Sequence, residues 1–234
     1  MDLSHVDIVG IAFQLIAFLF AISVHESAHA WMANRCGDPT ARMLGRISLN
    51  PIKHIDPVGT ILLPLVAAFT HIPVLGWAKP TPVDPRNFKN PVADDILTSV
   101  AGPISNLLVA TGALLAMFMV AKTSVQGHGL VQTMPFAYRL GIVGMGSSSV
   151  LVPIVLFLYE LMLINIVLAV FNLIPVPPLD GSHVLRHFLS DSLRRAYDAI
   201  GIFGLIALVY LGGGLLSALI FPPIRFFNSI LTRF

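Results

Sequence analysis

The chain has 234 residues, of which 14 are lysine or arginine and 12 are aspartate or glutamate, and its formal net charge is +2. Only 11% of the residues are charged and 56% are hydrophobic, whereas a soluble globular domain carries about 25% charged residues. This composition practically excludes a soluble enzyme or a disordered tail and predicts an all-α polytopic membrane protein in a lipid bilayer. No dense basic cluster occurs, so we expect no nucleic acid partner.

The first candidate span is the uncharged run Ile8–Val24, which continues as plausible helix to about Ala33. A helix needs about 20 residues to cross a bilayer, and three further runs reach that length: Ile96–Ala121, Leu151–Leu173 and Ala199–Ile224. Glu160 interrupts the third run, and the sequence alone assigns it no role. Together with the irregular stretches between them, these runs predict about four to six transmembrane helices.

Two irregular stretches follow the first span. Residues 41–50 alternate apolar and polar side chains towards their end, which predicts a short membrane-associated β-strand, with an interfacial loop as the alternative. The apolar stretch Pro57–Ala78 also contains Pro64 and Pro73, and proline in a helix interior costs about 3 kcal/mol. We therefore expect this stretch to be a re-entrant loop that other helices shield from lipid.

The basic residues predict the orientation of the chain. If Pro57–Ala78 re-enters without crossing, ten of the 14 basic residues lie on one side of the membrane; if it crosses, the larger group is eight. The positive-inside rule favours the first arrangement. We therefore expect a multi-pass protein of a cell membrane, such as the bacterial inner membrane, with its N-terminus outside and its active site towards the cytoplasm.

The first span ends in a His-Glu-x-x-His motif formed by His25, Glu26 and His29. Residues four apart lie on one face of a helix, so both imidazoles can bind a single Zn²⁺ ion. Glu26 is placed to act as the general base on an attacking water molecule. A polar helix end that reaches the membrane surface is the alternative, but imidazole and carboxylate groups inside a span are usually functional.

A catalytic zinc ion needs a third protein ligand and an open position. The residues after His29 lack the third histidine of a metzincin, and no glutamate occurs between Glu26 and Glu160, which excludes the gluzincin pattern. Asp180 follows the proline-rich end of the third span, which the predicted topology brings to the same side as the histidines. The competing candidate ligands are Asp56, His54 and the pair His183 and His187.

Three motifs together resemble the site-2 protease family of intramembrane zinc metalloproteases. They cover residues 25–181 and read His25-Glu26-x-x-His29, Gly102-x-x-x-Asn106 and Asn172-x-x-Pro175-x-x-x-x-Asp180-Gly181. The resemblance implies one Zn²⁺ per chain, held by His25, His29 and Asp180, with Glu26 as catalytic base. It further implies a re-entrant segment and cleavage of membrane protein substrates within or near a transmembrane helix.

Three more residues are expected to serve the reaction. Asn106 is the candidate donor to the developing oxyanion, and His54 and Asn172 are candidate substrate-binding residues. An interhelical hydrogen bond is the alternative for Asn106 and for His54. We also expect the strand at 41–50 to hold the unwound substrate by pairing with it.

The rival hypothesis from another class is a membrane zinc-binding transporter. One zinc-transporter family has proline at the fourth position of a similar motif, but Ala28 stands there in this chain. No second histidine-rich span supplies a binuclear pathway. We therefore favour a single membrane-embedded peptidase domain over residues 1–234, with its catalytic core at about 8–195 and without PDZ or CBS domains.

Overall fold

The computed structural model describes residues 8–63, 66, 77–143 and 149–233, and every regular element within these ranges is helical. Four of the described helices are long and apolar enough to cross a membrane. They are α1 (Ile8–Cys36), α4 (Pro91–Thr123), α6 (Leu151–Asn172) and α9 (Gly213–Leu231). The chain is therefore an all-helical, multi-pass membrane protein, as its composition predicts.

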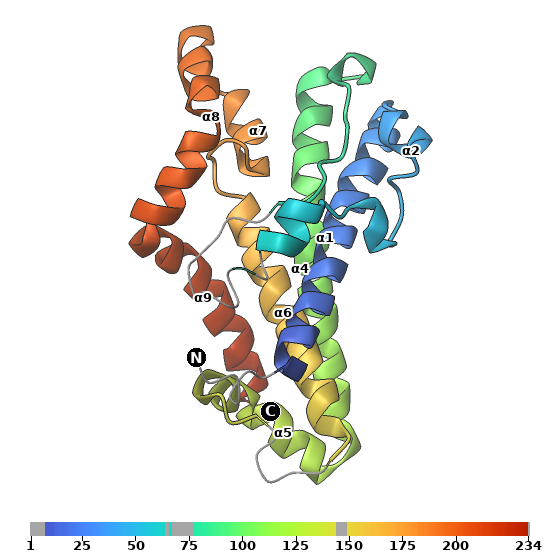
Figure 1. The fold of residues 1–234 in the computed structure, drawn as a ribbon, viewed down its shortest axis with the longest axis vertical. Coiled ribbons are helices and arrows are strands. Elements are labelled where there is room, and N and C mark those ends of the chain that lie inside the picture. The colour runs from blue at the N-terminus through green and yellow to red at the C-terminus, as the bar shows by residue number, and fades with distance from the viewer. Residues whose placement is uncertain (1–7, 64–65, 67–76, 144–148, 234) are drawn as a thin grey trace.

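Helices α1, α4 and α6 run side by side and form the centre of the molecule (Figure 1). Alanines buried completely on these helices include Ala17 and Ala21 on α1 and Ala110 on α4. Small side chains allow helix backbones in a membrane to approach closely. Larger apolar side chains of α4, α5 (Val125–Leu140), α6 and α9 fill one core beside them, with Met117, Met162 and Ile166 fully buried.

The predicted fourth span differs from the structure. Residues of the run Ala199–Ile224 belong to two helices, α8 (Asp191–Leu211) and α9, which meet at Gly212. Three consecutive glycines occupy positions 212–214, and each weakens a helix by about 1 kcal/mol relative to alanine. Gly201 adds a second break inside α8, because its φ of +49° lies outside the helical region.

The predicted strand at residues 41–50 is wrong. Its first residues belong to the short helix α2 (Thr40–Met43), and the rest is turn and irregular structure. Gly45 ends the helix with a φ of +68°, a left-handed conformation typical of helix C-termini. The Arg46 guanidinium then donates to the carbonyl oxygens of Lys53 and Lys79. The loop therefore folds against neighbouring loops, with no strand partner in the described ranges.

Part of the predicted re-entrant stretch, at 64–65 and 67–76, lies outside the described residues. Its beginning is the π-helix η3 (Pro57–Leu62), whose first amides donate to Asp56 Oδ1. Its end returns to that helix: the Trp77 amide donates to the Gly59 carbonyl oxygen at 3.2 Å, and the Thr60 hydroxyl to the Trp77 carbonyl oxygen at 2.8 Å. The two ends of the stretch therefore lie in contact.

Short elements connect this stretch to the long helices. They are the 3₁₀ turns η2 (Pro51–Lys53), before the stretch, and η4 (Pro85–Asn87), after it. Residues 77–84, which lead into η4, have no regular structure. The helix α7 (Asp180–Arg186) lies between α6 and α8 in the chain. Figure 1 shows α7 beside α8, at the end of the molecule where the upper part of α4 lies.

Candidate metal centre

Helix α1 places His25 and His29 on one face, as the four-residue spacing predicts. Both residues are buried, and their Nε2 atoms lie 3.0 Å apart. Two polar rings would be costly here without partners, because a buried polar group must replace the hydrogen bonds it made with water. The surroundings of the two rings are therefore informative.

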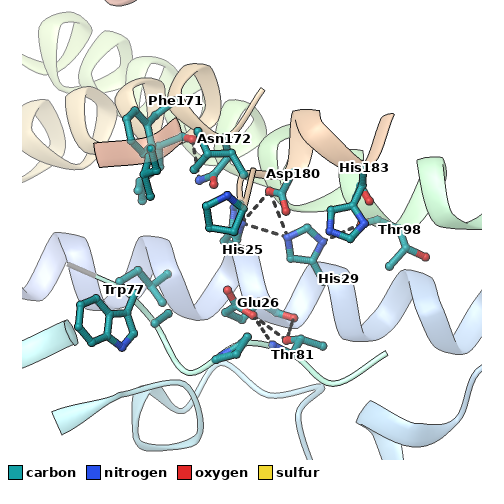
Figure 2. Close-up of a pocket in the computed structure, with 18 of the residues that line it drawn as sticks. His25, Glu26, His29, Trp77, Thr81, Thr98, Phe171, Asn172, Asp180 and His183 are labelled. Carbon is teal, nitrogen blue, oxygen red and sulfur yellow. Dashed lines mark hydrogen bonds and ion pairs between the residues drawn. The ribbon is translucent and has the colours of Figure 1, made fainter. Parts of the chain in front are cut away.

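Asp180, the first residue of α7, brings a carboxylate to both rings. Its Oδ2 atom lies 3.2 Å from His25 Nε2 and 3.4 Å from His29 Nε2. Figure 2 shows Asp180 pointing at the two histidines from the opposite wall of the cavity.

The far sides of the two rings each have an acceptor on α4. His25 Nδ1 lies 2.7 Å from Asn106 Oδ1, and His29 Nδ1 lies 2.7 Å from the carbonyl oxygen of Thr98. The Thr98 carbonyl oxygen can only accept a hydrogen bond. Asn106 Oδ1 is also an acceptor, because the Nδ2 of the same amide donates to other groups. Both histidines are therefore assigned as Nδ1–H tautomers, with an unshared electron pair on Nε2.

These atoms meet the requirements of a zinc site. Two unprotonated nitrogens and a carboxylate oxygen face one another, and they form the one such group of three candidate ligands among the described residues, with all ligand atoms within 4.8 Å. Asp180 Oδ2 is buried without a hydrogen-bond partner there. Because electron pairs so close repel each other, the arrangement calls for a cation. Two histidines and one carboxylate are a known catalytic zinc set.

Gly102 explains how α4 approaches so closely. A Cβ atom at this position would lie 2.4 Å from His29 Nε2 and 2.6 Å from His25 Cε1. Any side chain larger than hydrogen would therefore displace the two rings. Gly181, next to Asp180, is equally confined, because a Cβ there would lie 2.3 Å from the Leu173 carbonyl oxygen.

Asn106 lies one helical turn beyond Gly102 and is fully buried. Its Oδ1 contacts His25, while its Nδ2 donates to the Ala21 carbonyl oxygen at 3.2 Å and to Asn165 Oδ1 at 2.8 Å. Every one of these bonds goes to the protein itself. The oxyanion contact that the sequence suggests for Asn106 therefore stays a prediction, and its present bonds support the interhelical alternative.

Glu26 points away from the histidines, towards the extended segment 77–84 (Figure 2). The Thr81 amide and hydroxyl both donate to Glu26 Oε2, at 2.9 and 2.7 Å. The same hydroxyl lies 3.1 Å from the Glu26 carbonyl oxygen. Thr81 thus holds the carboxylate in one orientation against α1.

A cavity of about 810 Å³ opens beside these residues. Its walls come from α1, α4, α6, α7, α8 and the segment 77–83, and they include Glu26, Asn172 and the three candidate metal ligands. Apolar side chains such as Phe18, Phe171 and Ile206 form much of the remainder. The cavity can therefore admit an apolar chain segment beside a polar centre.

The other candidate ligands have different partners. His54 is buried with its Nε2 2.7 Å from the Ser48 carbonyl oxygen, and it does not line the cavity. Asp56 caps η3. His183 and His187 instead contact Asp95 on α4.

Sequence reasoning missed four residues around the site: Thr81, Thr98, Asn165 and Asp95. Thr98 acts through its backbone carbonyl, which no sequence pattern reveals. Thr81 and Asp95 lie outside the three motifs, and only the fold brings them to Glu26 and to α7. Asn165 has a weak signal, because an amide in the middle of an apolar span is uncommon and usually has a partner.

Known proteins that are similar to this chain also indicate a zinc-dependent peptidase. Residues 13–211 match the family model described as peptidase family M50. A Bacillus subtilis protein named "Putative zinc metalloprotease YwhC" is 37% identical over 198 residues, which are 84% of this chain and 78% of that protein. No solved structure matches this chain.

Two more distant relatives bear the same kind of name. Rip2 of Mycolicibacterium smegmatis is 26% identical over 87% of this chain and 68% of its own length. Rip2 of Mycobacterium tuberculosis is 29% identical over 86% of this chain and 67% of its own length.

Proposed function

Because the chain belongs to peptidase family M50 and is an intramembrane zinc metalloprotease, we propose that His25, His29 and Asp180 hold its Zn²⁺ ion and that Glu26 is the general base. The resemblance to the site-2 proteases is thereby confirmed. One observation carries the assignment of the ligands: three ligand atoms from two separated elements converge within 4.8 Å. The transporter hypothesis is not favoured by these relatives.

Zinc bound there would polarise the scissile carbonyl and lower the pKa of a water molecule. Glu26 would then accept the proton of the attacking water and pass it to the leaving amine. Thr81 already occupies Oε2 with two hydrogen bonds, so we assign the proton transfer to Oε1. In this division the bonds from Thr81 to Oε2 keep the carboxylate oriented, and Oε1 takes the proton at the edge of the cavity that Glu26 lines.

For Asn106 we propose a positioning role in place of direct contact with the oxyanion. Its Oδ1 accepts from His25 Nδ1, so it fixes both the ring orientation and the tautomer of that ligand. The carbonyl oxygen of Thr98 does the same for His29. Asn165 in turn orients the Asn106 amide.

The substrates that we propose are membrane proteins cleaved within or near a transmembrane helix. The apolar walls of the cavity support a substrate of this kind, since its side chains are themselves apolar. Asn172 lines the cavity and is placed to contact the substrate polypeptide. For His54, which lies outside the cavity lining, we propose a role in the loop through its bond to Ser48.

We also propose that Pro57–Ala78 re-enters the membrane without crossing it. The contact between Gly59 and Trp77 supports this proposal, because a crossing segment would separate its ends by about the 30 Å of the hydrocarbon core. In this arrangement the loops that carry ten of the 14 basic residues lie on the cytoplasmic side of a cell membrane. The active site faces the same side. We propose that residues 1–234 form a single peptidase domain with a catalytic core at about 8–195, and the family match over residues 13–211 supports this proposal.

The variant Glu26→Gln tests the proposed function in purified full-length protein. We expect zinc content to match that of the unmodified chain, while cleavage of a tagged single-span membrane protein in liposomes is lost. Retained cleavage would remove Glu26 from the mechanism. Zinc flux into the liposomes, with no proteolysis by the unmodified chain, would support the transporter instead.

A further inference from the structure

Asp180 is held at the start of a very short helix. Helix α7 has only seven residues and follows the irregular segment 173–179, which contains three prolines. Such a short helix is not stable by itself. Contacts with the rest of the protein must therefore hold α7, and with it the Asp180 carboxylate, beside the two histidines on α1.

The polar contact between α7 and α4 is made by Asp95. Its Oδ2 lies 2.7 Å from Nε2 of His187, the residue that ends α7, and its Oδ1 lies 3.6 Å from His183 Nδ1. His183 and His187 are four residues apart, so one carboxylate reaches both rings on one face of α7. The side chains of Asp95 and His187 are largely buried, at 14% and 17% exposure, where a charge-assisted hydrogen bond is strong.

The same part of α4 also holds a histidine of the metal centre. Thr98, whose carbonyl oxygen accepts from His29, lies three residues after Asp95 and thus about one helical turn away. Helix α4 therefore contacts α1 through Thr98 and α7 through Asp95. The distance between His29 and Asp180 depends on both contacts.

We propose that Asp95 is a positioning residue of the metal centre, which docks α7 through His187 and His183 and so places Asp180 beside His25 and His29. The proposal rests on the proposed function, since it takes these three residues as the zinc ligands. Asp95 itself does not bind the metal ion. Loss of its contact should let α7 move and should weaken zinc binding, even in a protein that stays folded.

Zinc affinity of the purified full-length chain tests this role without reference to proteolysis. A chromophoric zinc chelator competes with the protein, and circular dichroism verifies the fold of each variant. We expect Asp95→Ala to weaken zinc binding by about tenfold, the lower end of what removing a direct partner of a metal ligand costs, because Asp95 acts on Asp180 only through α7. Asp95→Asn, which keeps the size of the side chain, should weaken it less and serves if the alanine variant does not fold.

Asp94→Ala is the matched control. Asp94 is the adjacent carboxylate on α4, but it accepts from the Asn90 amide at the start of the helix. We expect this variant to lose stability and to keep its zinc affinity, because the partner of Asp94 is on its own helix and not on α7.

A double variant identifies the partner. If Asp95 acts through His187, then Asp95→Ala adds little to the loss already caused by His187→Ala. Unchanged zinc affinity in folded Asp95→Ala, or fully additive losses in the double variant, would overturn the positioning role. An unmodified chain that binds no zinc would instead overturn the proposed function, and this inference with it.

Discussion

The two sides of the proposed catalytic centre are held in different ways. His25 and His29 are buried between long helices, and their partners Asn106 and Thr98 lie on α4. Glu26 is only half-buried, and its partner Thr81 lies in a segment without regular structure. The metal side thus depends on helix packing, whereas the base side depends on one extended segment.

This difference separates two kinds of damage. A change on the metal side should cost zinc affinity, because it moves a ligand. A change on the base side should leave zinc in place and cost turnover, because it affects only the orientation of Glu26. The four substitutions that follow test the separation.

Gly102→Ala should have the largest effect. Its new Cβ would lie 2.4 Å from His29 Nε2, so we expect zinc binding at least about a hundredfold weaker, at the upper end of what the loss of a single ligand partner costs, and cleavage at background. Zinc competition and a cleavage assay measure both. Gly112→Ala is the matched control on the same helix, because no atom other than those of the adjacent helix turns lies within 4 Å of its Cβ position. It should be neutral or stabilise the helix by up to about 1 kcal/mol.

Asn106→Ala should follow, with zinc affinity about 10- to 100-fold lower. The substitution removes the acceptor of His25 Nδ1–H and leaves Asn165 Oδ1 without its donor. Zinc titration together with kcat distinguishes the two roles considered for Asn106. A variant with full zinc affinity and a reduced kcat would restore the oxyanion role and remove the positioning role.

Thr81→Val tests the base side. Valine keeps the shape of threonine but removes the hydroxyl that donates to Glu26 Oε2, while the backbone amide remains. Because a hydrogen bond to a charged group is worth about 1.5–3 kcal/mol, we expect kcat to fall about tenfold, with KM and zinc content unchanged. Thr81→Ser should restore kcat. Zinc loss in the valine variant would show that the two sides are not independent.

Asp38→Asn should have the smallest effect on the reaction. The fully buried Asp38 carboxylate accepts from Thr40, Asn87 and the Asp84 amide, and so ties the segment that carries Thr81 to the end of α1. We expect a loss of about 1–2 kcal/mol of stability at pH 7, a small decrease in kcat and unchanged zinc content. Thermal unfolding and the cleavage assay measure these changes.

The stability loss of Asp38→Asn should depend on pH. Burial opposes the charge of Asp38, but the hydrogen bonds from Thr40, Asp84 and Asn87 outweigh it and lower the pKa of this carboxyl. Its contribution is therefore fully present above the unfolded pKa of about 4 and is lost as the pH falls through the lower folded value. The difference in Tm between the two proteins should shrink in that acidic range, and a constant difference would contradict this origin.

Much of the fold follows from local pattern. The lengths of the first three spans are close to those of α1, α4 and α6 because twenty or more mainly apolar residues with at most one charge have few alternatives to a membrane helix. The fourth span was wrong in its bounds, since hydropathy does not register the break at Gly212. The strand at 41–50 was wrong because alternation over a few residues does not supply a neighbouring strand.

In the candidate site too, some features follow from local sequence and others depend on the tertiary structure. Spacing along one helix is a local property, so the sequence by itself determined that His25 and His29 share a face with Glu26 beside them. The tertiary structure alone decided which oxygen approaches the two rings, which groups set their tautomers and which residue holds the base. Those contacts join residues 55 to 155 positions apart, such as Glu26 with Thr81 and His25 with Asp180. Only the tertiary packing of the helices and of the segment 77–84 brings such pairs within a few ångströms.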